Sequence, residues 1–100
     1  MTAYMIVILD CTDPAWVAEY RAHVPALIER AGGRYLSLSR APALLEGDGP
    51  VPQTVAIISY PSAEAARAFF ASEEYRPYAE ARQRGAITTI YLVDGETIAA

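Results

Sequence analysis

The sequence has too little cysteine, histidine and lysine for several common classes of protein. Cys11 and His23 are the only residues of their kinds, and lysine is absent. A single cysteine excludes an intrachain disulfide, and one cysteine with one histidine cannot form the clusters that hold structural metals. We therefore predict no metal site.

Basic charge is also scarce. The eight arginines are outnumbered by twelve acidic residues, which gives a formal net charge of −4. The arginines are scattered along the chain, whereas neutralising nucleic-acid phosphates requires clustered basic side chains. Nucleic acid is therefore not an expected partner.

Long apolar runs and cofactor motifs are missing as well. The apolar run that begins at Tyr4 is too short for a signal-peptide core or a membrane span, and no basic segment precedes it. The chain contains no P-loop, GxGxxG or GxSxG motif. We expect a cytoplasmic protein with no membrane partner and no organic cofactor.

The sequence does contain a regular succession of apolar segments. A length of 100 residues with 53% hydrophobic residues predicts one folded domain, residues 1–100. Apolar or alternating patterns predict strands over residues 4–9, 34–39, 54–60 and 86–93, with helical segments over residues 14–31, 63–71 and 72–83. The order βαββαβ predicts a ferredoxin-like α+β fold, in which helices cover one face of an antiparallel sheet.

Capping residues and a proline set the expected course of the first helix. Asp13, followed by a proline, predicts its start, because aspartate is a good N-cap and proline is tolerated at the first helical position. Pro25 predicts a kink or a weak point in the helix, and Gly32-Gly33 predicts the end of the helix through a left-handed cap.

The second half of the chain has similar signals. Ser62 is the expected N-cap of the second helix, and Pro77 predicts a bend in the helical segment that follows it. Residues 43–46 predict a short extra strand, and the glycine- and proline-rich residues 47–53 predict a turn.

Three of the predicted strands are apolar on both faces. The stretches "YMIVIL", "VAIISY" and "AITTIYLV" carry apolar side chains at nearly every position. An antiparallel sheet with helices on one face would leave its other face exposed as an apolar patch. We therefore predict a two-fold symmetric homodimer that packs sheet against sheet, with a loop folding over the sheet as the alternative.

Few polar residues are candidates for chemistry. His23 falls at the edge of the apolar stripe of the first helix. It could act as a general base at the mouth of a cleft, or it could simply pair with Glu19 on the surface. The seven tyrosines could line an aromatic pocket or fill a dimer interface.

Glu46 and Arg82 are two further candidates. Glu46 stands just before a glycine at the end of a predicted strand, where a carboxylate could contact a ligand, act as a base or remain exposed. Arg82 precedes the last strand, where it could bind a carboxylate with two hydrogen bonds, or pair with Glu74 or Glu80.

Four segments are similar to those of one known family. They are "TDPAWVAEYRAHVPALIERAGGRYL" at residues 12–36, "LLEGD" at 44–48, "YPSAEAARAFFASEEYRPYAEARQRGA" at 60–86 and "LVDG" at 92–95. Together they resemble the DUF1330 family of dimeric α/β-barrel proteins. The resemblance implies ferredoxin-like subunits whose sheets face each other, with a cleft between sheet and helices in each. The family-like polar residues are Tyr20, Arg21, Glu46, Tyr75 and Arg82.

The chain departs from that family in its second and third strands. Members commonly carry an arginine and two glycines where this chain has Leu38, Ser39 and Arg40. They also commonly carry a glutamate where this chain has Ser59. Side chains two positions apart on a strand share a face, so our hypothesis is that Arg40 projects from the same face as Leu38, where it could take the place of the family arginine.

The resemblance implies no particular reaction, because the family is uncharacterised and the wider fold group includes monooxygenases, isomerases and ligand-sensing domains. Our first hypothesis is that the cleft binds a small organic metabolite, with acids among the candidates. Its expected ligand contacts are Tyr20, Arg40, Glu46, Tyr75 and Arg82, and its candidate catalytic residues are His23 and Glu46. The alternatives are a non-catalytic accessory or stress-linked module, and a cofactor-free monooxygenase- or isomerase-like enzyme.

Overall fold

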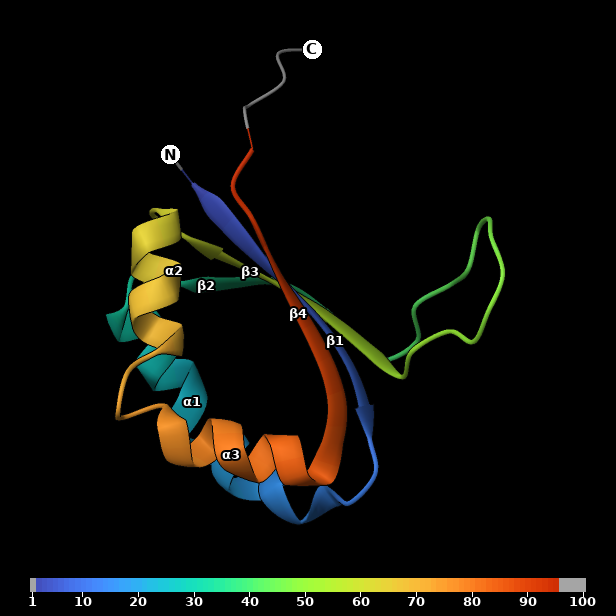
Figure 1. Ribbon diagram of the computed structural model, residues 1–100, viewed down its shortest axis with the longest axis horizontal. Helices are drawn as coiled ribbons and strands as arrows, with labels where there is room; N and C mark the ends of the chain where they lie inside the picture. Colours follow the sequence, from blue (N-terminus) through green and yellow to red (C-terminus); the bar gives the residue numbers. More distant parts are fainter. Residues whose placement is uncertain (1, 96–100) are drawn as a thin grey trace.

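Four antiparallel strands form one sheet, and helices cover one of its faces (Figure 1). The computed structural model describes residues 2–95. The strands lie in the order β2-β3-β1-β4, which confirms the ferredoxin-like βαββαβ fold. The elements are β1 (Ala3–Cys11), the 3₁₀ turn η1 (Pro14–Trp16), α1 (Val17–Arg30), β2 (Arg34–Ser39), β3 (Thr54–Tyr60), α2 (Ala63–Phe70), α3 (Arg76–Gly85) and β4 (Ala86–Val93).

The predicted strands β2, β3 and β4 have the bounds that their sequence patterns indicate, and β1 is longer at both ends. The extra strand predicted over residues 43–46 is wrong. Residues 40–53 form an irregular loop that projects away from the sheet (Figure 1). Two turn-forming glycines and three prolines follow or interrupt the short apolar run in this loop, so it has too few consecutive residues to pair with a neighbouring strand.

Side-chain caps start the first two helical segments as predicted. The Asp13 carboxylate accepts a hydrogen bond from the Ala15 N–H at 3.1 Å, and the capped turn η1 leads directly into α1. The Ser62 hydroxyl accepts from the Ala65 N–H at 3.1 Å at the start of α2. The bend predicted at Pro77 is wrong: this proline lies in the first turn of α3, where the missing N–H costs no hydrogen bond.

Gly32 ends α1 in the predicted left-handed conformation, with a φ of 85°. The Gly33 N–H donates to the Ile28 carbonyl at 2.8 Å, and the Gly32 N–H donates to the Glu29 carbonyl at 3.0 Å. These two bonds form a Schellman motif, which satisfies the last carbonyls of the helix. The helix runs through Pro25 as one continuous element.

A bulge at Leu36 changes the two faces of β2. Tyr35 pairs with Ile58, but Ser37 already pairs with Ile57, so one extra residue is inserted in β2. Regular strand alternation, which would place Tyr35 and Leu38 on opposite faces because they are three positions apart, is therefore interrupted. The register places both of these side chains on the helix-covered face.

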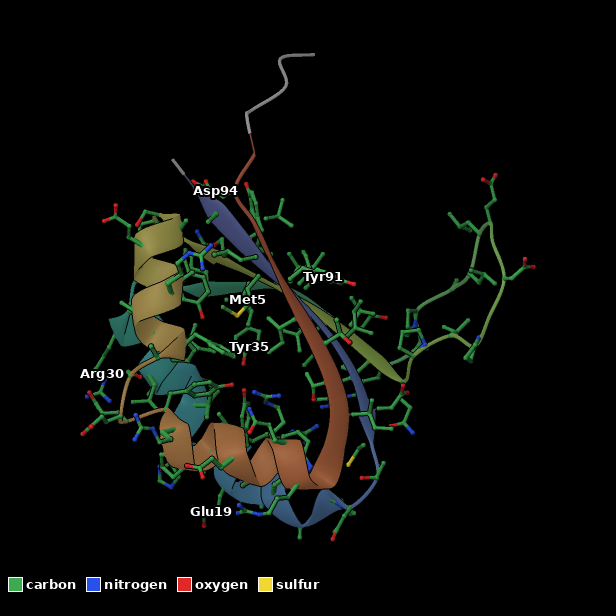
Figure 2. All side chains as sticks on the ribbon, viewed as in Figure 1. Met5, Glu19, Arg30, Tyr35, Tyr91 and Asp94 are labelled. Carbon is green, nitrogen blue, oxygen red and sulfur yellow. The ribbon has the colours of Figure 1, made fainter. Side chains whose placement is uncertain are left out.

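The core lies between the helices and the central strands. Met5, Ile58 and Tyr60 project from the sheet toward the buried residues of α1 and α2. Figure 2 shows Tyr35 on this inner side and Tyr91 on the opposite, outer side of the sheet. The outer side chains are largely apolar and at least partly exposed: Tyr4, Ile6, Ile8, Val55, Ile57, Ile87, Tyr91 and Val93.

None of the helices in residues 2–95 combines the length and the apolar character needed to cross a bilayer.

Candidate functional site

A cleft of about 590 Å³ lies between α1 and the inner face of the sheet. We call it the aromatic cleft, because Trp16, Tyr20 and Tyr35 line it together with aliphatic side chains. Its volume is in the range of small-molecule sites. The remaining lining residues are Val7, Leu9, Cys11, Val17, Arg21, Pro25, Leu38, Arg40, Thr54, Ala56 and Ile58.

Two tyrosines connect this cleft to the interior. The hydroxyl oxygens of Tyr20 and Tyr75 lie 2.7 Å apart, within hydrogen-bond distance. Their rings meet nearly edge to face, and Tyr75 also stacks on Phe69 at a centroid distance of 4.5 Å. Tyr75 is only 2% exposed, so packing from α2 holds its hydroxyl in place.

Arg82 is a buried cation beside these tyrosines. Only 3% of its surface is exposed, and its Nη2 donates a weak hydrogen bond to the Tyr75 hydroxyl at 3.4 Å. Its Nε has no hydrogen-bond partner within the described residues 2–95. Tyr75 can accept from Arg82 and still donate to Tyr20, and in that arrangement the Tyr20 proton is available for another acceptor.

No carboxylate compensates this charge within residues 2–95. The ion pairs there are His23 with Glu19 and Arg30 with Glu74. Glu74 therefore pairs with Arg30. Within residues 2–95, Arg82 forms no ion pair with Glu74 or Glu80. A buried cation without a counter-ion is costly, so this site has a deficit of negative charge.

Arg82 also lines a second, smaller cavity of about 330 Å³, which we call the Arg82 cavity. Thr88 on β4 lines this cavity, and its hydroxyl oxygen is buried without a hydrogen-bond partner among residues 2–95. Gln83 contributes an amide. Two buried polar groups that lack partners therefore border the same cavity, beside the apolar side chains of Phe70, Ala86 and Ile90.

The hydroxyls of Tyr20, Tyr35 and Tyr60 remain protonated near neutral pH, because each has a raised pKa. Burial raises the pKa of Tyr20 far above its usual value, and the neighbouring Tyr75 raises it further. Burial, followed by the proximity of Tyr35, raises the pKa of Tyr60, and burial followed by Tyr75 raises that of Tyr35. These groups can therefore donate hydrogen bonds, but they are poor bases.

His23 lies outside both cavities. Its Nε2 lies 3.2 Å from a Glu19 carboxylate oxygen one helical turn away, and its side chain is 53% exposed. The ring also packs against Tyr78 at a centroid distance of 5.6 Å. Glu19 and His23 therefore form a surface pair on α1.

Glu46 also lies away from the aromatic cleft of its own chain. It is exposed in the projecting loop, and it lines neither cavity. The two candidate catalytic residues, His23 and Glu46, are therefore not brought together within the described chain. In contrast, hydrogen bonds link Arg82 to Tyr75 and Tyr75 to Tyr20.

Arg40 and Leu38 both line the aromatic cleft. The bulge at Leu36 precedes them, so their two-residue spacing still places both on the inner face. Ser59, at the other departure from the family pattern, pairs with Tyr4 and Arg34 on the outer face. This position is therefore remote from the cleft.

Sequence reasoning did not single out Tyr35, Tyr60 or Thr88 as site residues. All three project toward the helices, and the hydroxyl oxygens of Tyr60 and Thr88 are buried without partners. The sequence predicted that these residues lie on strands. It could not predict which of their hydroxyls lack hydrogen-bond partners, because that depends on how the helices pack on the sheet. No cluster of three potential metal ligands occurs within the residues that the structure describes.

The βαββαβ fold places this chain in a structural class, and its sequence places it in a family. This chain has the architecture of the dimeric α/β-barrel proteins, a group that is typically homodimeric. Residues 2–96 match the model described as domain of unknown function DUF1330, and the chain belongs to that family. No curated protein matches its sequence.

Solved structures with this fold cover nearly all of the chain. The RPA0582 protein of unknown function from Rhodopseudomonas palustris is 18% identical, with a TM-score of 0.78 over 97% of this chain and 84% of that one. SnoaB, a cofactor-independent oxygenase from Streptomyces nogalater, is 17% identical, with a TM-score of 0.66 over 97% and 95%. Rv0793 from Mycobacterium tuberculosis is 16% identical, with a TM-score of 0.60 over the full length of both chains. These identities show a shared fold and no shared activity.

Proposed function

We propose that this protein binds a small organic anion, of the carboxylate class, between its sheet and its helices. The observation that carries the proposal is the buried Arg82, which has an unpartnered Nε and no carboxylate partner within residues 2–95. A bound carboxylate supplies the missing negative charge and accepts hydrogen bonds from the guanidinium. The unpartnered hydroxyl of Thr88 offers one more donor in the same cavity.

The tyrosines support the same ligand class. Tyr20 and Tyr35 stay protonated because burial raises their pKa, so they offer donors to an oxygen-rich ligand. The aromatic cleft beside them has the volume and apolar lining to hold an organic body, and Arg40 at its border adds a second positive charge. We propose Arg82 and Thr88 as the anion contacts in the Arg82 cavity. Tyr20 and Arg40 are the proposed contacts in the aromatic cleft, and Tyr75 links the two places through its hydrogen bonds to Arg82 and Tyr20.

Binding without proton transfer by His23 or Glu46 fits the geometry best, because neither residue lines the aromatic cleft or the Arg82 cavity. A catalytic role for either requires a rearrangement or a second chain.

A thermal-shift screen tests the anion site. The probes are aliphatic and aromatic monocarboxylates, each compared with its neutral amide. A carboxylate at a hundred times its dissociation constant stabilises the folded state by about 2.7 kcal/mol, and its amide does so much less. Arg82→Met should abolish this difference, because methionine fills similar space without charge.

The matched control is Arg76→Met, which removes an exposed arginine from the same helix. It should retain the preference for carboxylates. Equal shifts by carboxylates and amides in the wild type, or an unchanged preference in folded Arg82→Met, would contradict the proposal. Circular dichroism of each variant establishes that it is folded.

We further propose that the functional unit is a homodimer that packs through the outer sheet face. That face is apolar, and Ile87 and Tyr91 are 69% and 57% exposed in the single chain. Apolar patches of this kind are usually covered by a partner. Sedimentation equilibrium at micromolar concentration should give twice the chain mass, and a stable monomer would overturn this assembly.

A further inference from the structure

The loop over residues 40–53 is long and has no regular structure of its own. Loops of this length inside small domains usually have a function. This one does not fold back on its own chain. Figure 1 shows it projecting from the ends of β2 and β3 on the side of the sheet opposite the helices.

Hydrogen bonds fix the base of the loop. The Gln53 N–H donates to the Asp10 carboxylate at 2.8 Å, and the Cys11 N–H donates to the Gln53 side-chain oxygen at 3.0 Å. The Ala41 N–H donates to the Ser39 hydroxyl at 3.3 Å. Three prolines further limit the conformations of the loop, so its outward direction is set by local chemistry.

The loop presents apolar side chains that the chain itself does not cover. Leu45 is 96% exposed, and Leu44 and Val51 are 52% and 42% exposed. Gly47, with a φ of 110°, lies between Leu45 and Val51, and a Cβ added at this glycine would meet no atom within 4 Å. Burying one such leucine is worth about 2 kcal/mol, and that stabilisation is absent in the single chain.

The exposed outer face of the sheet lies on the same side as this loop. Figures 1 and 2 show the loop and Tyr91 both on the side away from the helices. A second copy that covers Tyr91 and Ile87 therefore stands beside the loop as well. In a two-fold dimer, a contact that one loop makes with the other subunit occurs twice.

We propose that residues 41–52 form a docking arm that packs on the second copy of this chain, with Leu45 as its apolar anchor. This inference rests on the homodimer proposed above. It also gives Glu46 a different place from the one expected from sequence. The Glu46 carboxylate, next to the anchor, lies against the partner subunit rather than in the aromatic cleft of its own chain.

Sedimentation equilibrium of Leu45→Asp tests the arm. A charged anchor should weaken each of the two equivalent contacts by about tenfold, so the dimer dissociation constant should rise about a hundredfold. The matched control is Ala26→Asp, which adds the same charge at an exposed position of α1, on the helical side. It should leave the dissociation constant unchanged.

A photo-crosslinkable residue at position 45 gives a second readout that does not depend on destabilising the dimer. Irradiation should produce a covalent species of twice the chain mass, and the same residue at position 26 should not. Crosslinks within one chain only, or an unchanged dissociation constant for folded Leu45→Asp, would overturn the arm. A wild type that sediments as a monomer would instead overturn the homodimer itself, which separates the two failures.

Discussion

The hydroxyl oxygens of Tyr20 and Tyr75 lie 2.7 Å apart, although the residues are 55 positions apart in the chain. This contact joins α1 to the start of α3 and stands between the aromatic cleft and Arg82. It therefore contributes both to the packing of the helices and to the donor set of the proposed site.

Removing either hydroxyl should destabilise the fold by about 1 kcal/mol, because the remaining phenol loses its partner. Tyr20→Phe and Tyr75→Phe are compared with the double variant by urea unfolding. The double variant should cost less than the sum of the single changes, since both remove the same hydrogen bond. Strictly additive costs would show that the two hydroxyls are not coupled.

High pH should destabilise the protein through its buried tyrosines. The pKa values of Tyr20 and Tyr60 are raised in the folded state, so below about pH 10 both states hold these protons. Above that pH the unfolded chain loses them first, and the free energy of unfolding falls by roughly 1.4 kcal/mol per pH unit for each phenol.

Urea unfolding between pH 8 and 11 measures this slope, and the absence of lysine means that no lysine ammonium group titrates in this window. Tyr60→Phe should make the fall shallower. The absorbance of phenolate from these tyrosines should rise only with unfolding. A slope that Tyr60→Phe does not change would contradict the assignment.

Gly85→Ala should destabilise the protein by about 1 to 3 kcal/mol. An added Cβ would overlap the Trp16 ring and come within 2.6 Å of the Asp13 carbonyl oxygen. The Gly85 carbonyl also accepts hydrogen bonds from Thr12, Asp13 and Trp16, which fix η1 on α3. The control is Gly95→Ala, where a Cβ would meet nothing, and equal denaturation midpoints for the two variants would contradict the prediction.

His23→Ala should leave both stability and carboxylate binding nearly unchanged. The pair with Glu19 is exposed, and such pairs contribute less than about 1 kcal/mol. The thermal-shift screen with carboxylates measures the binding. A lost response in folded His23→Ala would place this histidine in the site and favour the general-base alternative over the surface pair with Glu19.

Much of the fold follows from local signals. The bounds of β2, β3 and β4 follow from apolar and alternating patterns. The caps at Asp13, Gly32 and Ser62 depend on atoms only a few residues away, so sequence alone identifies them. The apolar outer face was likewise predictable, because strand side chains alternate between faces.

The candidate site was only partly predictable. Tyr20, Tyr75 and Arg82 were named from the sequence, but Tyr35 and Thr88 were not, and His23 and Glu46 lie elsewhere. The bulge at Leu36, which brings Tyr35 to the inner face, arises from how β2 pairs with β3. The register between two strands depends on contacts between segments that are distant in the sequence, so local patterns do not predict it.

The sequence by itself determined the order of strands and helices, their caps and the excess of apolar strand surface. Only the tertiary structure decided that Arg82 is buried without a carboxylate, that Glu74 pairs with Arg30 instead, and that the loop after β2 points away from the helices. The physical reason is range. Backbone preference and capping act within one or two turns, whereas burial and charge pairing depend on which distant segments the fold brings together.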